Sequence, residues 1–92
     1  MVYVLGKLKL ESYEKWKPLF DERSSARKES GSKEAHLFRN SENQNEVVIL
    51  FDWDNIENAR KYMESDSLKK LLLNVGAEII EITYLDEQET SV

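Results

Sequence analysis

The chain has no cysteine, a single proline, a single histidine and only three glycines among its 92 residues. Without cysteine it forms no disulfide, no thiolate metal site and no thiol nucleophile. The lone His36 has no companions with metal-ligand spacing, so we expect no metal site. Phosphate-binding loops and nucleophile elbows are missing as well. No apolar run approaches the ~20 residues that a membrane helix needs, so we expect no membrane partner.

Basic charge is also scarce, because 13 Lys and Arg residues face 18 Asp and Glu residues and the net charge is −5. An acidic chain is a poor binder of polyanions, so we expect no nucleic-acid partner. Hydrophobic residues make up 40% and charged residues 34%, which is an ordinary globular composition for one small domain. The sequence opens directly into a strand pattern without a basic segment or cleavage site, which favours a cytoplasmic protein.

The first half of the chain changes from strand to helix periodicity. Val2–Leu10 alternates apolar and polar residues, as a strand does. Apolar residues then recur at helical spacing up to Gly31, a residue type that suits a helix C-terminus. Pro18 disfavours helix at Lys17, so we expect a first turn from Ser12 and the regular helix from about Pro18.

The second half of the chain predicts a hairpin, two short helices and a last strand. The turn residues SENQN separate the two strands of the hairpin, and short polar side chains precede both helices as N-caps. The expected elements are an edge strand Ser32–Asn40, a strand Glu46–Trp53, a helix Ile56–Ser65 capped by Asp54 or Asn55, a helix Leu68–Val75 capped by Asp66 or Ser67, and a strand Ala77–Leu85.

This order, β-α-β-β-α-β, predicts an α+β ferredoxin-like fold with a four-stranded antiparallel sheet. The first and third strands should be the inner ones, since Val2–Leu5 and Val47–Phe51 are apolar on both faces. We expect a single domain over residues 1–85 and an acidic flexible tail over residues 86–92. Because two helices cover only one face of such a sheet, a second copy should cover the other face and form a homodimer.

The register of the predicted hairpin decides which side chains meet the second copy. If Asn40 pairs with Glu46, then His36 lies opposite Leu50 on the face given to the partner, and Val48 lies on the same face. A slip of one residue would move His36 to the helix side. His36 is therefore either a hydrogen-bonded interface residue or, in the functional alternative, a catalytic group.

The stretch EVVILFDWDNIENARKYMESDSLKKLLLNVG, Glu46–Gly76, resembles the small dimeric α+β barrel proteins of the antibiotic biosynthesis monooxygenase-like or cyclase-like group. YEKWKPLFDERSSARKESG is similar to the first helix of that group, and the element order matches along nearly the whole chain. The resemblance implies a homodimer whose two sheets pack into a barrel. It also implies a cavity between the sheet and the helices of each subunit.

The activities of that group depend on residues that are mostly absent here. The haem-degrading members use an Asn in the first strand, a helical Trp and a His ligand, and this chain has no such Asn and places Tyr62 and Leu72 at the other two positions. The quinone-forming monooxygenases use no cofactor and share the strand-end Trp, here Trp53. Their Asn and Tyr correspond to Ile49 and Ala59. The comparison favours no haem and no other cofactor, and it leaves a monooxygenase or cyclase activity open.

The aromatic and basic side chains at helical spacing are the candidates for a ligand cavity. Trp53 either fills the core or forms a cavity wall. Arg23 and Arg27 continue the stripe of Trp16 and Phe20, either as solvated side chains or as cations that hold an anionic or enolate ligand. The candidate cavity residues are Trp16, Phe20, Arg23, Trp53 and Tyr62.

Three function classes remain open. The first is a cofactor-free monooxygenase- or cyclase-like enzyme acting on a small aromatic compound. The second is a non-catalytic dimer that binds a small ligand in the same cavity. The third is an interaction module whose core is full. A cavity of roughly 300 Å³ or more between sheet and helices would favour the first two classes.

Overall fold

In the structure, a computed structural model that describes residues 2–92, four strands form one sheet in the order β2-β3-β1-β4. Each strand runs antiparallel to its neighbours, and β1 and β3 are the inner strands. The predicted α+β ferredoxin-like fold is confirmed. The elements are β1 (Val2–Leu10), α1 (Tyr13–Glu22), α2 (Ser24–Ser30), β2 (Ala35–Arg39), β3 (Glu46–Trp53), α3 (Ile56–Met63), α4 (Asp66–Asn74) and β4 (Ala77–Asp86).

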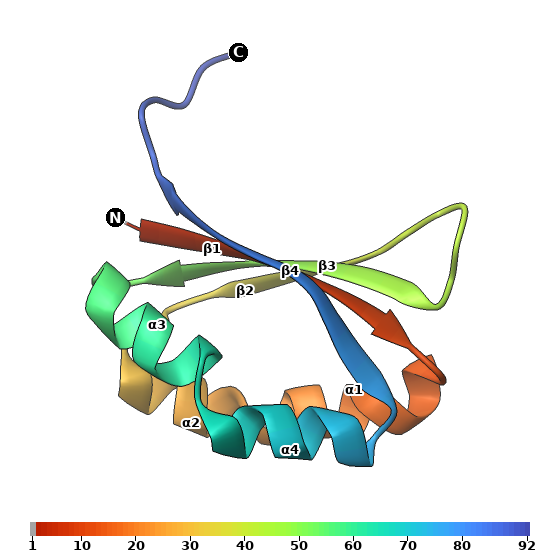
Figure 1. Cartoon of the computed structure of the whole chain (residues 1–92). Helices are drawn as coiled ribbons and strands as arrows, with labels where there is room; N and C mark the ends of the chain where they lie inside the picture. Colours follow the sequence, from red (N-terminus) through yellow and green to blue (C-terminus); the bar gives the residue numbers. More distant parts are fainter. Residues whose placement is uncertain (1) are drawn as a thin grey trace.

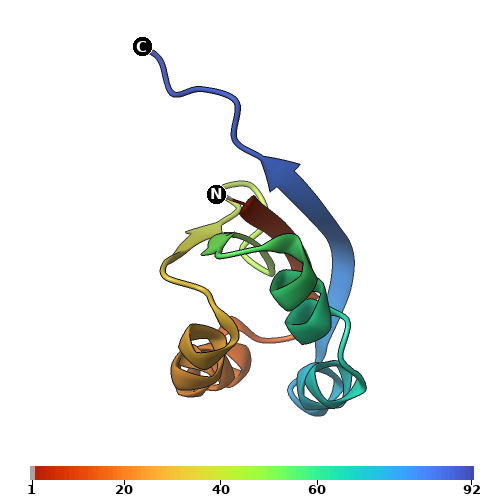
Figure 2. The ribbon, with the colours of Figure 1, turned by 90° about the vertical axis from the view of Figure 1, so that its left-hand side faces the viewer.

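All of these helices lie on one face of the sheet (Figure 1). In Figure 2, α1 and α2 lie together at the lower left, α4 lies at the lower right, and α3 lies nearer the sheet, while the segment after β4 extends away from the helices. The opposite face of the sheet, which we call the bare face, is covered by no element of the described chain. Within residues 2–92, no helix is long and apolar enough to cross a membrane.

The first helical region differs from the prediction in two ways. The helix is regular from Tyr13, because Ser12 is an effective N-cap whose side chain accepts a hydrogen bond from the Lys15 amide. Pro18 therefore lies inside α1, and the expectation that the regular helix begins near Pro18 is wrong. The region also breaks at Arg23 into α1 and α2, and α2 ends, as predicted, at Gly31, whose φ is 119°.

The capping of the later helices is partly as predicted. Asn55, one of the two expected residues, caps α3 by accepting a hydrogen bond from the Asn58 amide. The N-cap of α4 is Ser65 rather than Asp66 or Ser67. The Ser65 hydroxyl accepts a hydrogen bond from the Leu68 amide, so the observed cap lies one residue before the earlier predicted cap and α4 begins at Asp66.

The hairpin has the register that places His36 on the bare face. The Asn40 amide donates to the Glu46 carbonyl, and His36 lies directly opposite Leu50. The Nε2 atom of His36 is 3.3 Å from a carboxylate oxygen of Glu34. The sheet therefore directs His36 away from the helices and from anything held beneath them.

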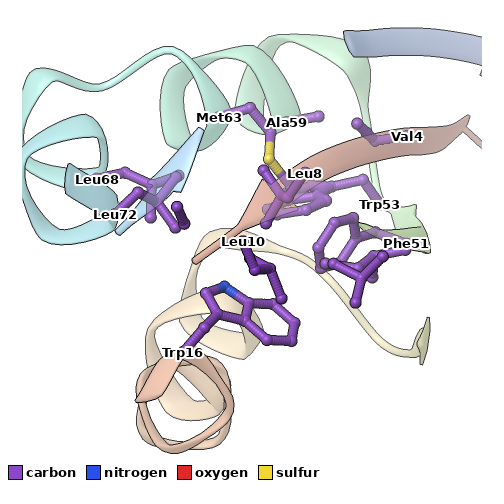
Figure 3. Close-up of a cluster of buried hydrophobic side chains, with 13 residues drawn as sticks. Val4, Leu8, Leu10, Trp16, Phe51, Trp53, Ala59, Met63, Leu68 and Leu72 are labelled. Atoms are coloured by element: carbon purple, nitrogen blue, oxygen red, sulfur yellow. The ribbon is translucent and has the colours of Figure 1, made fainter. Parts of the chain in front are cut away.

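The core lies between the sheet and the helices, where alternate residues of the inner strands point toward the helical layer. Trp16 from α1 lies below β1 and β3, and Leu68 and Leu72 approach from α4 (Figure 3). The buried apolar side chains are Val4, Leu8, Leu10, Trp16, Val47, Ile49, Phe51, Trp53, Ala59, Met63, Leu68, Leu72 and Ala77.

Candidate functional site

A pocket with a volume of about 70 Å³ lies between the sheet and the helices. Almost all of its wall is apolar, and the polar side chains that reach it are Arg23, Arg27 and Tyr62. The lining residues are Gly6, Leu8, Trp16, Leu19, Phe20, Arg23, Arg27, Ile49, Phe51, Tyr62, Met63, Leu68, Leu72, Ile79 and Ile82.

The structure brings four of the five candidate cavity residues to this pocket, namely Trp16, Phe20, Arg23 and Tyr62. Trp16 and Phe20 are four residues apart on α1, so they share one side of the helix and their ring centres are 5.2 Å apart. Together they form an aromatic wall that faces the sheet. Such a wall can stack against a planar ligand.

Trp53, the fifth candidate, is not among the lining residues. Its side chain is completely buried, with the ring centre 5.9 Å from that of Phe51 and 5.5 Å from that of Tyr62. The indole Nε1 donates a hydrogen bond to the Ser30 carbonyl at 3.2 Å. Trp53 therefore packs behind Phe51 and Tyr62, two residues that do line the pocket.

Arg27 also lines the pocket and is only 8% exposed. Its Nη1 donates to the Phe20 carbonyl at 2.9 Å, and its guanidinium carbon is 4.2 Å from the centre of the Phe20 ring. Burial lowers the pKa of Arg27 from its ordinary value, and the nearby phenol of Tyr62 acts in the opposite direction. The helical stripe that the sequence shows does include Arg27, but periodicity alone does not tell a buried guanidinium from a solvated one.

Arg23 is half-buried and contacts the side chain of Tyr62. Its Nε donates to the Tyr62 hydroxyl at 3.3 Å, and its guanidinium carbon lies 5.5 Å from the centre of that ring. This contact joins the end of α1 to α3, 39 residues later in the chain. The pair places a phenol and a second cation at the wall that Arg27 also occupies.

The wall formed by the strands contains residues that strand alternation does not predict. Ile79 and Ile82 both line the pocket although they are three residues apart on β4. An irregularity in the pairing with β1 allows this, because Leu8 pairs with Ile79 and Lys7 pairs with Glu81, which leaves Ile80 without a partner on β1. Gly6 lies opposite Ile82 and leaves the floor of the pocket open.

The pocket is smaller than the roughly 300 Å³ that ligand sites usually reach. A groove of about 380 Å³ lies beside it between α3, α4 and β4, and Met63, Leu72, Ile79 and Ile82 line both spaces. Met63 has an unbranched side chain with several rotatable bonds. A change of its rotamer would therefore open the pocket toward the groove and enlarge it. A ring-sized ligand needs such a movement.

No carboxylate or imidazole lines the pocket, and within residues 2–92 there is no group of three His, Cys, Asp or Glu residues that could hold a metal ion. His36 lies on the bare face. Leu72, which the sequence resemblance aligns with the haem ligand of the haem-degrading proteins, contributes an aliphatic side chain to the pocket. The chemistry that this site offers is therefore apolar enclosure, aromatic stacking and hydrogen-bond donation from Arg23, Arg27 and Tyr62.

The fold and the pocket describe a small ferredoxin-like α+β protein with a small apolar pocket between its sheet and its helices. Residues 1–72 match the model of the antibiotic biosynthesis monooxygenase family, and the chain belongs to that family. The family resemblance of the sequence is thus confirmed. No curated protein sequence matches the chain significantly.

Several solved structures are similar along nearly their whole length. SnoaB, a cofactor-independent oxygenase from Streptomyces nogalater, has a TM-score of 0.78 and 13% identity over 97% of this chain and 94% of its own. A putative antibiotic biosynthesis monooxygenase from Deinococcus radiodurans has a TM-score of 0.70 and 18% identity over 100% of this chain and 97% of its own. A dimeric ferredoxin-like protein from an uncultured marine organism has a TM-score of 0.63 and 14% identity over 99% of this chain and 97% of its own. At these identities the similarity shows the fold.

Proposed function

We propose that this chain forms a homodimer in which each subunit binds one small aromatic compound in the pocket and oxidises it with O₂ without a cofactor. The observation that carries the proposal is the pocket itself. It is an apolar space walled by Trp16 and Phe20, and the largely buried Arg27 side chain also lines it. SnoaB, a cofactor-independent oxygenase, has the same fold and supports the choice of reaction.

The proposed reaction needs no electron source other than the substrate. A phenol with a free carbon opposite its hydroxyl group reacts with O₂ to give a quinone and water. The ring gives up four electrons, one oxygen atom becomes the second carbonyl, and the other leaves as water. The protein would hold the ring against the wall of Trp16 and Phe20 and exclude bulk water.

The bare face supports the homodimer. It carries apolar side chains that nothing in residues 2–92 covers, including Phe38 at 56% exposure and Leu85 at 40%. Antiparallel pairing places them on one surface, since Leu5 lies opposite Leu50 and Val48 opposite Phe38. A second copy would bury this surface in a two-fold interface, with His36 at its edge. The apolar residues of the bare face are Tyr3, Leu5, Phe38, Val48, Leu50 and Leu85.

The second candidate is non-catalytic binding of the same ligand. The observation that favours it is the absence of any carboxylate or imidazole among the lining residues, because such a group usually accepts the proton of a phenol. In this case the pocket binds the ring but does not accelerate its oxidation.

The test uses 1-naphthol and the full-length protein. Trp16 lines the pocket and Trp53 does not, so in the Trp53→Phe background the fluorescence of Trp16 should be quenched saturably. An oxygen electrode should then record one O₂ consumed per naphthoquinone formed. Quenching without O₂ uptake would refute the oxygenase and support the second candidate, non-catalytic binding. The absence of saturable quenching would refute both candidates and favour an interaction module.

A further inference from the structure

Arg27 is a buried cation whose charge Asp21 stabilises without forming a salt bridge. It is 8% exposed, and none of the salt bridges formed by residues 2–92 includes it. Burying a charge is costly unless another charge or several hydrogen bonds compensate for it. The Phe20 carbonyl and the faces of Phe20 and Phe51 compensate in part, at 2.9 Å for the hydrogen bond and 4.2 and 5.8 Å for the ring contacts. The site therefore favours a further negative charge.

The remaining donors of Arg27 have access to the pocket. A guanidinium group carries several N–H donors in one plane, and the Phe20 carbonyl occupies only Nη1. Within residues 2–92, no fully buried side-chain nitrogen or oxygen lacks a hydrogen-bond partner. The guanidinium nitrogens that have no partner must therefore contact accessible space, and Arg27 lines the pocket. A ligand in the pocket can reach these donors.

Tyr62 adds a second donor on the same wall. Its hydroxyl accepts a hydrogen bond from the Nε of Arg23, so its own proton remains free to be donated. A donor that itself accepts from a cation is polarised and binds an anionic oxygen more strongly. Tyr62 and Arg27 line the same pocket and are close enough for the phenol to affect the ionisation of the guanidinium.

We propose that the Arg27 guanidinium and the Tyr62 hydroxyl together bind the oxygen of a phenolate or enolate, so that the pocket selects acidic aromatic compounds in their anionic form. The inference rests on the proposed function, since it assumes that a ring occupies the pocket. The substrate class is then phenols and enols, and Arg27 and Tyr62 share one role, the binding of the anionic oxygen. The proton of the phenol O–H bond leaves to solvent, and its electron pair stays on the bound oxygen.

The proposal also accounts for a site that lacks a general base. Two donors that stabilise the anion lower the pKa of the bound phenol, so the ligand can lose its proton to water or buffer without a carboxylate or an imidazole nearby. A phenolate is richer in electrons than a phenol and reacts more readily with O₂. The pocket would thus promote oxidation by electrostatic stabilisation of the reactive form of the substrate.

The experiment measures the ionisation of 4-nitrophenol, whose anion is yellow, in the presence and absence of the protein. With saturating protein we expect the bound phenol to titrate at lower pH than the free phenol, corresponding to at least about tenfold tighter binding of the anion. Arg27→Met should abolish this preference. Tyr62→Phe, which keeps the ring, should reduce it by roughly tenfold or less. Arg27→Lys should retain part of it.

A matched control is Arg60→Met, because Arg60 is exposed on α3 and packs over Tyr84 at 5.2 Å rather than at the pocket. It removes the same charge from the chain and should leave the preference unchanged. Nitrobenzene, a neutral ring of similar size, reports the pocket itself and should bind both the parent protein and Tyr62→Phe with similar affinity.

The outcomes separate the two proposals. If nitrobenzene binds but 4-nitrophenol titrates in the bound state as it does in solution, the anion site is refuted and the aromatic pocket stands. If the pKa of bound 4-nitrophenol shifts equally in Arg27→Met and in the parent protein, the anion site is also refuted. If neither compound binds, both the anion site and the proposed function are wrong.

Discussion

The indole of Trp53 donates its hydrogen bond to the Ser30 carbonyl at 3.2 Å, and this contact ties the end of β3 to the end of α2. The ring is completely buried between Phe51 and Tyr62. Trp53 thus supports the pocket from behind, since both of these neighbours contribute to its wall. Its place at the end of a strand is explained by packing and by this hydrogen bond.

Trp53→Ala should lower the free energy of unfolding by about 3–5 kcal/mol, because it removes a fully buried side chain and leaves a cavity. Trp53→Phe should cost less, since it keeps most of the burial and loses the hydrogen bond to Ser30. Urea unfolding followed by circular dichroism measures both. A loss within about 0.5 kcal/mol for Trp53→Ala, as for a surface residue, would contradict the core role.

Much of the fold could be predicted from the sequence because apolar alternation reports which face of a strand is buried. Residues 47, 49, 51 and 53 share one parity, and the structure turns all four toward the helices. Parity does not report depth, however. The pattern therefore does not tell a core side chain from a cavity wall, and the structure places Trp53 behind Phe51 and Tyr62.

Other features depend on contacts that the local pattern does not contain. The cap at Ser65 is one choice among several short polar residues that propensity ranks almost equally. The break at Arg23 has no such local signal, because the Arg23 side chain makes no capping hydrogen bond. The wall of Ile79 and Ile82 depends on an irregular pairing between β1 and β4. The burial of Arg27 follows from the approach of Phe20 and Phe51, which lie 7 residues before it and 24 residues after it.

The bare face gives a prediction about assembly. The protein should be a dimer at micromolar concentration, and Leu50→Glu or Val48→Glu should dissociate it, because the new charge would be buried without a partner at a cost of several kcal/mol. Light scattering measures the mass against 10.8 kDa for one chain. Leu73→Glu is the matched control, since Leu73 is 73% exposed on α4, in the helical layer. A parent protein that is monomeric throughout this range would refute the prediction.

The residue at the haem-ligand position gives a prediction about cofactors. Leu72 offers the pocket an aliphatic side chain, and the purified protein should bind neither haem nor a stoichiometric transition metal. Titration with haemin, followed at the Soret band, and metal analysis of the purified protein measure this. A Soret band that saturates at one haem per chain would show that another residue serves as the ligand.

Tyr84 predicts a loss of stability at alkaline pH. Burial, and then a hydrogen bond that its hydroxyl donates to Glu64 at 2.7 Å, raise the pKa of Tyr84 from 10.0 to about 12. Between these values the unfolded chain loses the phenolic proton while the folded chain keeps it. The contribution of Tyr84 is therefore complete below about pH 10 and is lost as the pH rises toward about 12.

Tyr84→Phe should show a smaller loss of stability than the parent protein over this range when urea midpoints are compared. Tyr13→Phe is the control, since it removes a phenol from α1, away from the bare face. If stability falls with pH in parallel for the parent protein and Tyr84→Phe, then Tyr84 titrates alike in the folded and the unfolded chain and the prediction is wrong.

Gly6 gives the most direct test of the pocket as a binding site. A Cβ atom at this position would meet the Cε2 atom of Phe51 at 3.7 Å, an ordinary van der Waals contact, and would project into the floor of the pocket. Gly6→Ala should therefore keep the fold, and its free energy of unfolding should rise by about 0.4–1 kcal/mol because the unfolded chain loses conformational freedom.

The same methyl group should weaken the binding of 1-naphthol several-fold. Fluorescence titration of Trp16 in the Trp53→Phe background measures the affinity, and urea unfolding measures the stability. Unchanged affinity in a variant that folds normally would place the ligand outside this pocket.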